Sequence, residues 1–327
     1  MPAARFFFIG MGWALMWLAS GAHAQGTYPN RPIHFIVPYM NGGLGDTFGR
    51  AMAQYLSQRL GQPVIVDNRP GASQVIAMEA TAKAVPDGYT IAYGTQSGMV
   101  FTTVSKKSLP YDPLKDFAPI GMLFDTPFYL IVHPSLPVKN VQELIAYVRA
   151  HPGKLSFASI GVASGQHLAM ELFRSRVGGL DMLHVPYKGS AAAAIDMVSG
   201  RVQVMFEGPA TTTSSARTGK LRVLASSGVQ RTRAMPNVPT VAESGVPGFE
   251  IATWFGLQTT AGVPRPIIER LNQEVSQWLR LPDTSEKVAD KFSLDLKTST
   301  PEEMGARIAR EIPIFAKLLR SAGIEPE

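Results

Sequence analysis

Short apolar segments alternate with amphipathic helical stripes along most of this chain, and this alternation limits the fold more than any other feature. Residues 33–38 (IHFIVP) form an apolar run typical of a buried parallel strand. After a loop, apolar residues recur every three or four positions from Phe48 to Leu60, as in an amphipathic helix. Strand-like runs at 64–67 and 90–93 follow, with a helical stretch between them. This order predicts a βαβαβ unit with a parallel sheet.

A second series of the same rhythm begins near residue 128. Its predicted strands and helices are residues 128–132, 141–148, 155–158, 166–177, 182–186, 190–199 and 202–206. Two further strands are predicted at 221–225 and 251–258.

The tail of the chain is helical. Helices open at Pro266 and Pro301, and Pro313 should kink or break the last one. Two α/β series of similar size, with the chain returning to the first after the second, predict two lobes whose mostly parallel sheets are flanked by helices. We place lobe 1 at residues 25–124 plus 228–327 and lobe 2 at residues 125–227.

The first 24 residues differ from the rest. Arg5 precedes an apolar run at 6–18, and Ala22-His23-Ala24 has the small-x-small pattern of a secretory cleavage site. The run is shorter than the roughly 20 apolar residues that a membrane span needs. We predict that residues 1–24 are a cleaved signal peptide and that the mature chain is exported, with a retained membrane anchor as the second interpretation.

Several classes of protein are excluded by what the chain lacks. It has no cysteine, which excludes disulfide scaffolds, thiolate metal sites and thiol catalysis. The histidines form no H-x-x-x-H pair, and the segment 161–165 (GVASG) is not the G-x-S-x-G elbow of a hydrolase. We therefore predict no metal site and no catalytic residue. The net charge of +6 comes from scattered basic residues, which argues against a nucleic-acid partner.

Three loops between a predicted strand and the following helix share one composition. Residues 41–47 (NGGLGDT), 159–165 (SIGVASG) and 187–190 (YKGS) are rich in glycine and small hydroxyl side chains. Glycine lets backbone N–H groups turn towards a ligand, and a helix start adds unpaired donors and the positive end of the helix dipole. Any α/β protein needs such residues at its turns, so a single loop would indicate little. Three alike favour binding of a carboxylate or phosphate.

The first of these loops also has some features of a dinucleotide-binding fingerprint. Gly43 and Gly45 open a helix, and Asp67 ends the next strand 22 residues after Gly45. Phe48 stands where the third glycine of that fingerprint permits close packing of helix on strand. We therefore predict no nucleotide and no other cofactor.

An ordered series of motifs covers essentially the whole chain after residue 24. The motifs are YPNRPI at 28–33, IVPY at 36–39, GGxxD at 42–46, DNRPGA at 67–72, PDGYT at 86–90, YDPxxDF at 111–117, GxHLAxELF at 165–173, HVPYKG at 184–189, PTVAESG at 239–245, WFGL at 254–257 and AGI at 322–324. In these motifs the chain resembles the substrate-binding proteins of tripartite tricarboxylate transporters, the Bug or TctC-like family.

The resemblance implies a fold and a function. The fold is that of a two-lobed periplasmic binding protein, of the Venus-flytrap kind and type II-like, with its ligand in the cleft between the lobes. The function is capture of a small carboxylate (mono-, di- or tricarboxylate, aromatic acids included) for transporter subunits in the inner membrane. The resemblance further implies a periplasmic protein that is not an enzyme, and we expect it to be a monomer.

The ligand-binding residues are carried over by position. On lobe 1 they are Tyr39, Asn41, Gly42, Gly43, Leu44, Gly45, Asp46, Thr47, Thr95, Gln96 and Ser97. On lobe 2 they are Ser159, Gly161, Ala163, Ser164, His167, Tyr187, Lys188, Gly189, Ala191 and Glu207. The chain departs from the family pattern at Asn41, Ser73-Gln74, Ala192 and Glu207, where Ala, Gly-Gly, Pro and Asp or Asn are common, and these departures leave the identity of the acid open.

Two other functions stay open at this point. One is an exported α/β hydrolase acting on a small ester or acid, for which Ser164 is the candidate nucleophile. The other is a ligand carrier that docks to a membrane sensor kinase.

Overall fold

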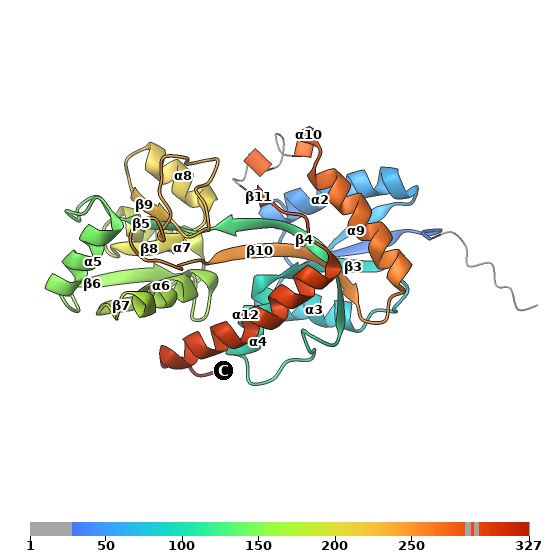
Figure 1. Cartoon of the computed structure of the whole chain (residues 1–327), viewed down its shortest axis with the longest axis horizontal. Helices are drawn as coiled ribbons and strands as arrows, with labels where there is room; N and C mark the ends of the chain where they lie inside the picture. Colours follow the sequence, from blue (N-terminus) through green and yellow to red (C-terminus); the bar gives the residue numbers. More distant parts are fainter. Residues whose placement is uncertain (1–27, 285–288, 291–293, 327) are drawn as a thin grey trace, which may run out of the picture.

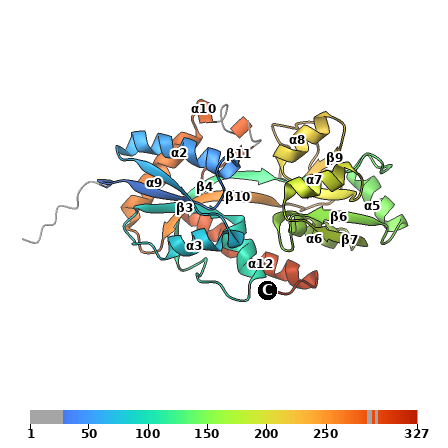
Figure 2. The ribbon, with the colours of Figure 1, turned by 180° about the vertical axis from the view of Figure 1, so that it is seen from behind.

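The computed structural model describes residues 28–284, 289–290 and 294–326, so the predicted signal peptide lies outside the described residues. Two lobes lie side by side and are joined by two long strands (Figure 1). The same arrangement is seen from behind in Figure 2. Within the described ranges, no helix combines the length and the apolar character needed to cross a membrane.

Lobe 1 is built on a six-stranded sheet with the strand order β11-β4-β10-β3-β1-β2. Its strands are β1 (Ile33–Val37), β2 (Val64–Asn68), β3 (Thr90–Thr95), β4 (Phe117–Pro127), β10 (Ala252–Thr260) and β11 (Asp295–Leu296). Its helices are α2 (Leu44–Leu60), η1 (Ala72–Gln74), α3 (Val75–Ala82), the π-helical η2 (Ser97–Phe101), α4 (Thr102–Ser105), α9 (Arg265–Leu279), α10 (Pro282–Thr284) and α12 (Pro301–Ser321).

Lobe 2 is built on a five-stranded sheet with the strand order β7-β6-β8-β5-β9. Its strands are β5 (Tyr129–Val132), β6 (Leu155–Ser159), β7 (Met182–Pro186), β8 (Val204–Glu207) and β9 (Arg222–Ser226). Its helices are α5 (Val141–Ala150), α6 (Gly165–Arg176), α7 (Ser190–Val198) and α8 (Pro209–Arg217).

The two-lobed α/β architecture predicted from the sequence is confirmed, but both sheets are mixed rather than mostly parallel. In lobe 1, β1 pairs in parallel with β2 and β3, whereas β10 runs antiparallel to both β3 and β4. In lobe 2, β6 pairs in parallel with β7 and β8, whereas β5 runs antiparallel to β8 and β9. The β4–β10 pair is antiparallel because β4 leaves lobe 1 and β10 returns to it, in opposite directions.

The C-terminal helix packs against both lobes. α12 contacts β4 and η2 of lobe 1 and also α6 of lobe 2 (Figure 1). It runs from Pro301 to Ser321 through Pro313, so of the predicted kink or break at that proline, the break does not occur. One continuous hydrophobic cluster, which includes Phe101, Phe128 and Phe315, crosses the junction beside it. The two lobes therefore share a core as well as two strands.

Candidate functional site

The loop after β1 leads to a helix start without a side-chain cap. Gly43 is the N-cap of α2; its backbone is extended, and it makes no side-chain cap bond. Asn41, Gly42 and Gly43 are exposed, and Gly42 has a φ of +87°, a conformation that favours glycine. The first N–H groups of a helix have no partner within the helix. The start of α2 therefore offers backbone donors to an anion.

Asp46 holds this loop in place. Its carboxylate accepts hydrogen bonds from the Gly42 N–H at 2.9 Å, from Arg50 Nε at 3.1 Å and from Asn68 Nδ2 at 2.9 Å. Burial raises the pKa of Asp46, but the bonds from Arg50, Gly42 and Asn68 outweigh it and lower the pKa below its usual value. The carboxylate is thus an anion whose protein donors are already in place.

A polar chain behind the loop joins Tyr39 to Thr95. Gln74 donates from Nε2 to the Tyr39 hydroxyl at 3.0 Å, and its Oε1 accepts a hydrogen bond from the Thr95 hydroxyl. Thr95 Oγ1 in turn accepts from the Gly98 N–H at 3.1 Å. Burial raises the pKa of Tyr39, so its hydroxyl stays protonated and can donate. Gln74 was not among the residues predicted for the site.

Gln74 lies in a turn whose backbone conformation is rare for residues other than glycine. Ala72, Ser73 and Gln74 have φ values of 45°, 52° and 76°, all in the left-handed region. Non-glycine residues in that region cost free energy and cluster at functional sites. The replacement of the usual Gly-Gly by Ser73-Gln74 was the sequence signal that could have identified this position.

Gln96 connects the lobe 1 loops to the junction between the lobes. Its Nε2 donates to Glu311 Oε2 at 2.9 Å, and the indole Nε1 of Trp254 donates to the same oxygen at 2.7 Å. Arg307 donates to the other oxygen of Glu311 at 2.8 Å and to Asp125 at 2.9 Å. This junction network of Gln96, Trp254, Glu311, Arg307 and Asp125 links a predicted ligand loop to β4, β10 and α12. Sequence analysis missed its charged members.

The first loop of lobe 2 is closed by its own side chains. Ser164 is the N-cap of α6: its Oγ accepts from the His167 N–H and donates to the Gly161 carbonyl at 2.7 Å. Ser159 Oγ donates to the same carbonyl at 3.0 Å. The Ser164 hydroxyl is therefore engaged in capping the helix, and the hydrogen bonds described for it involve no general base.

The stacked imidazoles of His167 and His184 contact this loop and support it. His167 Nδ1 accepts from the Ala163 N–H at 3.1 Å, and its ring stacks on that of His184 with centroids 3.9 Å apart. The imidazole Nε2 of His184 lies 2.7 Å from Ser159 Oγ. Burial, with smaller contributions from His184 and Arg174, lowers the pKa of His167 to about 3, and burial also lowers the pKa of His184. Both rings are neutral at pH 7, and His184 is a support that the prediction did not include.

The second loop of lobe 2 leaves a helix start open. α7 begins at Ser190 after Gly189, which makes no side-chain cap bond, and the neighbouring Lys188 and Ala191 are exposed. The Tyr187 hydroxyl donates to Asp196 Oδ2 at 2.8 Å. Burial and this bond to a carboxylate raise the pKa of Tyr187 to about 12.

Glu207 ends β8 beside this second loop. Its Oε1 accepts from the Gly208 N–H and from Ser190 Oγ, while its buried Oε2 has no partner among the described residues. Burial raises the pKa of Glu207 above its usual value.

The sheets bring the predicted residues to one edge of each lobe. Because β1 and β3 are parallel, the loops that follow them lie at the same edge of the first sheet, and the parallel β6, β7 and β8 do the same for the second. The edges approach each other at Gly165, where an added Cβ would lie 2.8 Å from the Phe128 ring and 3.3 Å from the Phe101 ring. Phe101 ends η2, which follows Gln96 directly. The structure thus places η2, which begins at the predicted site residue Ser97, beside the start of α6 in lobe 2.

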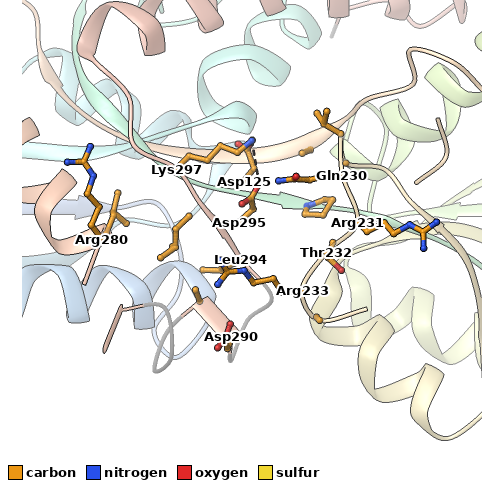
Figure 3. A pocket seen from close by; sticks show the side chains of 18 of the residues that line it. Asp125, Gln230, Arg231, Thr232, Arg233, Arg280, Asp290, Leu294, Asp295 and Lys297 are labelled. Carbon is orange, nitrogen blue, oxygen red and sulfur yellow. Dashed lines mark ion pairs between the residues drawn. The ribbon is translucent and has the colours of Figure 1, made fainter. Parts of the chain in front are cut away.

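A cavity of about 920 Å³ lies elsewhere, between the segment 228–234 and the segment that follows α9 (Figure 3). Asp125 of β4 lines it together with Lys297, which forms ion pairs of 2.7 Å with Asp125 and 3.5 Å with Asp295. Its lining includes none of the predicted ligand-binding residues, all of which the structure describes. Arg231, another residue of its lining, forms an ion pair of 2.9 Å with Glu243.

Comparisons with known proteins show which family the chain resembles over most of its length. Residues 48–313 match the family model described as tripartite tricarboxylate transporter family receptor, TctC. Protein BugT of Bordetella pertussis is 37% identical over 301 residues, which cover 91% of this chain and 91% of BugT. A protein encoded in the tcbD-tcbE intergenic region of Pseudomonas sp. strain P51 is 35% identical over 94% of this chain and 92% of its own length.

Solved structures are similar over nearly the same length. An R. palustris protein, Rpa4515 with adipate, is 33% identical, with a TM-score of 0.79 over 92% of this chain and 100% of that one. The periplasmic binding protein BugD is 30% identical with a TM-score of 0.74, over 92% of this chain and 100% of BugD. MatC of Rhodopseudomonas palustris with bound malate is 28% identical with a TM-score of 0.73, over 89% of this chain and 100% of MatC.

Proposed function

Because the chain belongs to the tripartite tricarboxylate transporter family of receptors, the Bug/TctC solute-binding proteins, we propose that it captures a small organic acid between its lobes. The captured acid is then delivered to a transporter in the inner membrane. Members of this family are binding proteins and not enzymes, so the exported hydrolase considered from the sequence is wrong.

One observation carries the proposal: the start of α2 has no side-chain cap and follows an exposed loop. Gly43 provides no side chain to cap the helix, and the loop before it is exposed. Asp46 fixes that loop through Gly42, Arg50 and Asn68. A carboxylate on the first N–H groups of α2 would gain charge-assisted hydrogen bonds and a favourable interaction with the helix dipole. No cationic side chain is needed for this.

The ligand class and the compartment come from the relatives. Two solved relatives were obtained with adipate and with malate, which are carboxylates. BugD is a periplasmic binding protein. We extend both properties to this chain as part of the proposal: the ligand is a small carboxylate and the mature protein works in the periplasm, after removal of residues 1–24.

The rest of the proposal concerns the two lobes. The ligand lies between the loop residues predicted on lobe 1 (25–124 plus 228–327) and those predicted on lobe 2 (125–227), and the protein works as a monomer. A captured acid favours the closed arrangement only through contacts that it lacks in the open one. The position of Gly165 against Phe101 and Phe128 supports a ligand site that spans both lobes, since the loops on either side already meet there.

Leu44→Pro tests the proposed anion site directly. Leu44 is the first residue of α2, where proline is tolerated because its missing N–H has no partner in the helix. Gly43 has φ −79° and ψ 179°, which is compatible with a following proline. The substitution therefore removes one proposed ligand donor and leaves the helix start intact.

The measurement is isothermal titration of wild-type protein, Leu44→Pro and Leu44→Ala with a panel of mono-, di- and tricarboxylates. Leu44→Ala is the matched control, because it loses the same side chain and keeps the N–H. We expect at least one acid to bind wild type, with a loss of affinity in Leu44→Pro at least tenfold greater than in Leu44→Ala. A folded wild-type protein that binds no carboxylate would contradict the proposed function.

A further inference from the structure

In lobe 2, the side-chain carboxylate of Glu207 lies beside the helix start where a second carboxylate of the ligand would bind. Glu207 is the last residue of β8 and is 3% exposed. Its Oε1 accepts from the Gly208 N–H at 2.6 Å and from Ser190 Oγ at 3.2 Å. Gly208 precedes α8 and Ser190 opens α7, and neither helix has a side-chain cap bond. Donors at helix starts are the groups that bind a ligand carboxylate. Glu207 accepts from one backbone N–H, that of Gly208, and from the Ser190 side-chain hydroxyl, and among the described residues it does not use the first amides of α7.

The fold does not use the second oxygen of this carboxylate. Glu207 Oε2 is buried and has no hydrogen-bond partner among the residues that the structure describes. Burying an unpaired charged oxygen costs stability. A glutamine at 207 would satisfy the same two donors through its amide oxygen and would carry no charge. The two hydrogen bonds therefore do not explain why a charged residue stands at 207. The charge itself would matter only to a group that it attracts or repels, such as a charged ligand.

The charge lies close enough to the open start of α7 to affect a ligand bound there. Glu207 Oε1 bonds to Ser190, the first residue of that helix. Two carboxylates about 6 Å apart, at an effective dielectric constant of about 20, repel each other enough to weaken binding by about a hundredfold. A second ligand carboxylate on the first amides of α7 would meet a repulsion of this order. A hydroxyl, amide or ammonium group at the same place would not be repelled.

Lobe 1 has no comparable obstacle. Its acidic residue, Asp46, has its carboxylate bound to Gly42, Arg50 and Asn68, and the cation of Arg50 offsets its charge. Glu207 is bonded to uncharged donors, and no ion pair is recorded for it among the described residues. The two lobes thus differ in what they offer a ligand: open backbone donors on lobe 1, and an uncompensated carboxylate beside the donors on lobe 2.

We infer that Glu207 is a specificity-determining residue: it makes this protein select organic acids with a single carboxylate, which lobe 1 binds, and with an uncharged or hydrogen-bond-donating far end, which faces lobe 2. This inference rests on the proposed function and narrows it. Relatives were solved with adipate and malate, which are dicarboxylates. Dicarboxylates such as these are the class that Glu207 is proposed to disfavour in this chain.

The test is isothermal titration with acids matched in length. Adipate is compared with the ω-hydroxy acid and the mono-amide of the same chain length, and succinate with its own two analogues. The proteins are wild type, Glu207→Gln and the control Glu269→Gln, which removes an exposed carboxylate of α9. For each diacid, the measured quantity is the ratio of the affinity for its tighter-binding analogue to the affinity for the diacid itself. We expect this ratio to be at least ten in wild type and in the control. In Glu207→Gln we expect the ratio to fall by tenfold or more, or to reverse.

Two results would overturn the inference. One is a diacid that binds wild type at least as tightly as its matched analogues, and the other is a ratio that Glu207→Gln leaves unchanged. The ratio measured on wild type decides alone if Glu207→Gln does not fold. Failure of the proposed function looks different, because folded wild-type protein would then bind neither class of acid.

Discussion

Both lobes have a helix start without a side-chain cap, α2 in lobe 1 and α7 in lobe 2, but the acidic residue beside each start is used differently. In lobe 1, the N-cap of α2 is a glycine without a cap bond, and the nearby Asp46 is used to hold the loop from behind. In lobe 2, Ser164 caps α6 with its own hydroxyl, and Glu207 accepts hydrogen bonds from the Ser190 hydroxyl, beside the open start of α7, and from the Gly208 N–H before α8. A helix start binds either a protein group or a ligand, since the donors are the same. From this comparison we infer that lobe 1 supplies the anion site, while lobe 2 determines what the far end of the ligand must be.

The largest expected effect is a loss of stability when the ion pairs at the junction between the lobes are broken. Arg307→Met removes the cation that lies between Asp125 and Glu311 under the junction. Removing one partner of a buried ion pair leaves an uncompensated charge, and we expect the free energy of unfolding to fall by about 3–5 kcal/mol. Urea denaturation followed by circular dichroism measures this.

Arg310→Met, an exposed change on the same helix, is the control. Because one hydrophobic cluster crosses the junction, the variant should still unfold in a single transition at a lower urea concentration. Two separate transitions in wild-type protein would contradict a core shared by both lobes.

The next largest effect is a pH-dependent change in stability that arises in lobe 2. The pKa of His167 is lowered to about 3, so the unfolded chain takes up a proton below about pH 6.5 that the folded chain refuses until about pH 3. Stability is therefore present above pH 6.5 and is lost as the pH falls through this window. Between pH 7 and pH 5 we expect His167 to account for a loss of about 2 kcal/mol.

His167→Asn isolates this contribution, because an amide oxygen can accept the Ala163 N–H as Nδ1 does and does not titrate. Urea denaturation at both pH values should show a smaller loss for this variant than for wild type. His34→Asn, at an exposed position of β1, is the control. An unchanged pH dependence in His167→Asn would show that the stacked histidines do not set the acid stability.

A smaller effect tests the cap of lobe 2 by itself. Ser164→Ala removes the hydroxyl that accepts the His167 N–H at the start of α6. Loss of an N-cap side chain costs about 1 kcal/mol. Thermal unfolding of Ser164→Ala beside Ser175→Ala, an exposed change near the end of the same helix, measures the difference. Equal melting temperatures would mean that this cap does not stabilise lobe 2.

The smallest effect on stability comes from giving lobe 1 the cap that lobe 2 has. Gly43→Ser places a hydroxyl at the N-cap of α2, where the backbone is extended and an added Cβ meets only the Met40 carbonyl oxygen at 3.9 Å. We expect a gain of a few tenths of a kcal/mol. Binding of organic acids should nevertheless weaken, because the serine competes for the same amides. Titration of Gly43→Ser against Gly43→Ala separates that competition from bulk, and equal affinities would contradict an anion site at α2.

Much of this structure follows from local sequence, and the exceptions have physical reasons. The run at 33–38 predicted β1, and the stripe from 48 to 60 predicted most of α2, because burial sets the spacing of apolar residues. β4 was missed: its sequence, FAPIGMLFDTP, contains prolines and a glycine, and the strand is held by pairing with the distant β10. α8, with the sequence PATTTSSAR, was missed because it has no apolar stripe.

The candidate site divides in the same way. Loop composition pointed to the helix starts at Gly43 and Gly189, because glycine and small hydroxyl residues are local signals. Gln74 and Glu311 were missed, since their partners are brought close only by the fold: Gln74 bonds to Tyr39 and Thr95, and Glu311 bonds to Gln96 from 215 residues away. No spacing rule connects such residues.

The most direct measurement is a crystal structure of the protein with the tightest-binding acid from the titrations. The account predicts that the ligand carboxylate lies on the first backbone amides of α2, after Gly43, with an uncharged or donating group towards α7 and Glu207. A carboxylate bound at the start of α7, with α2 unoccupied by any part of the ligand, would contradict the account.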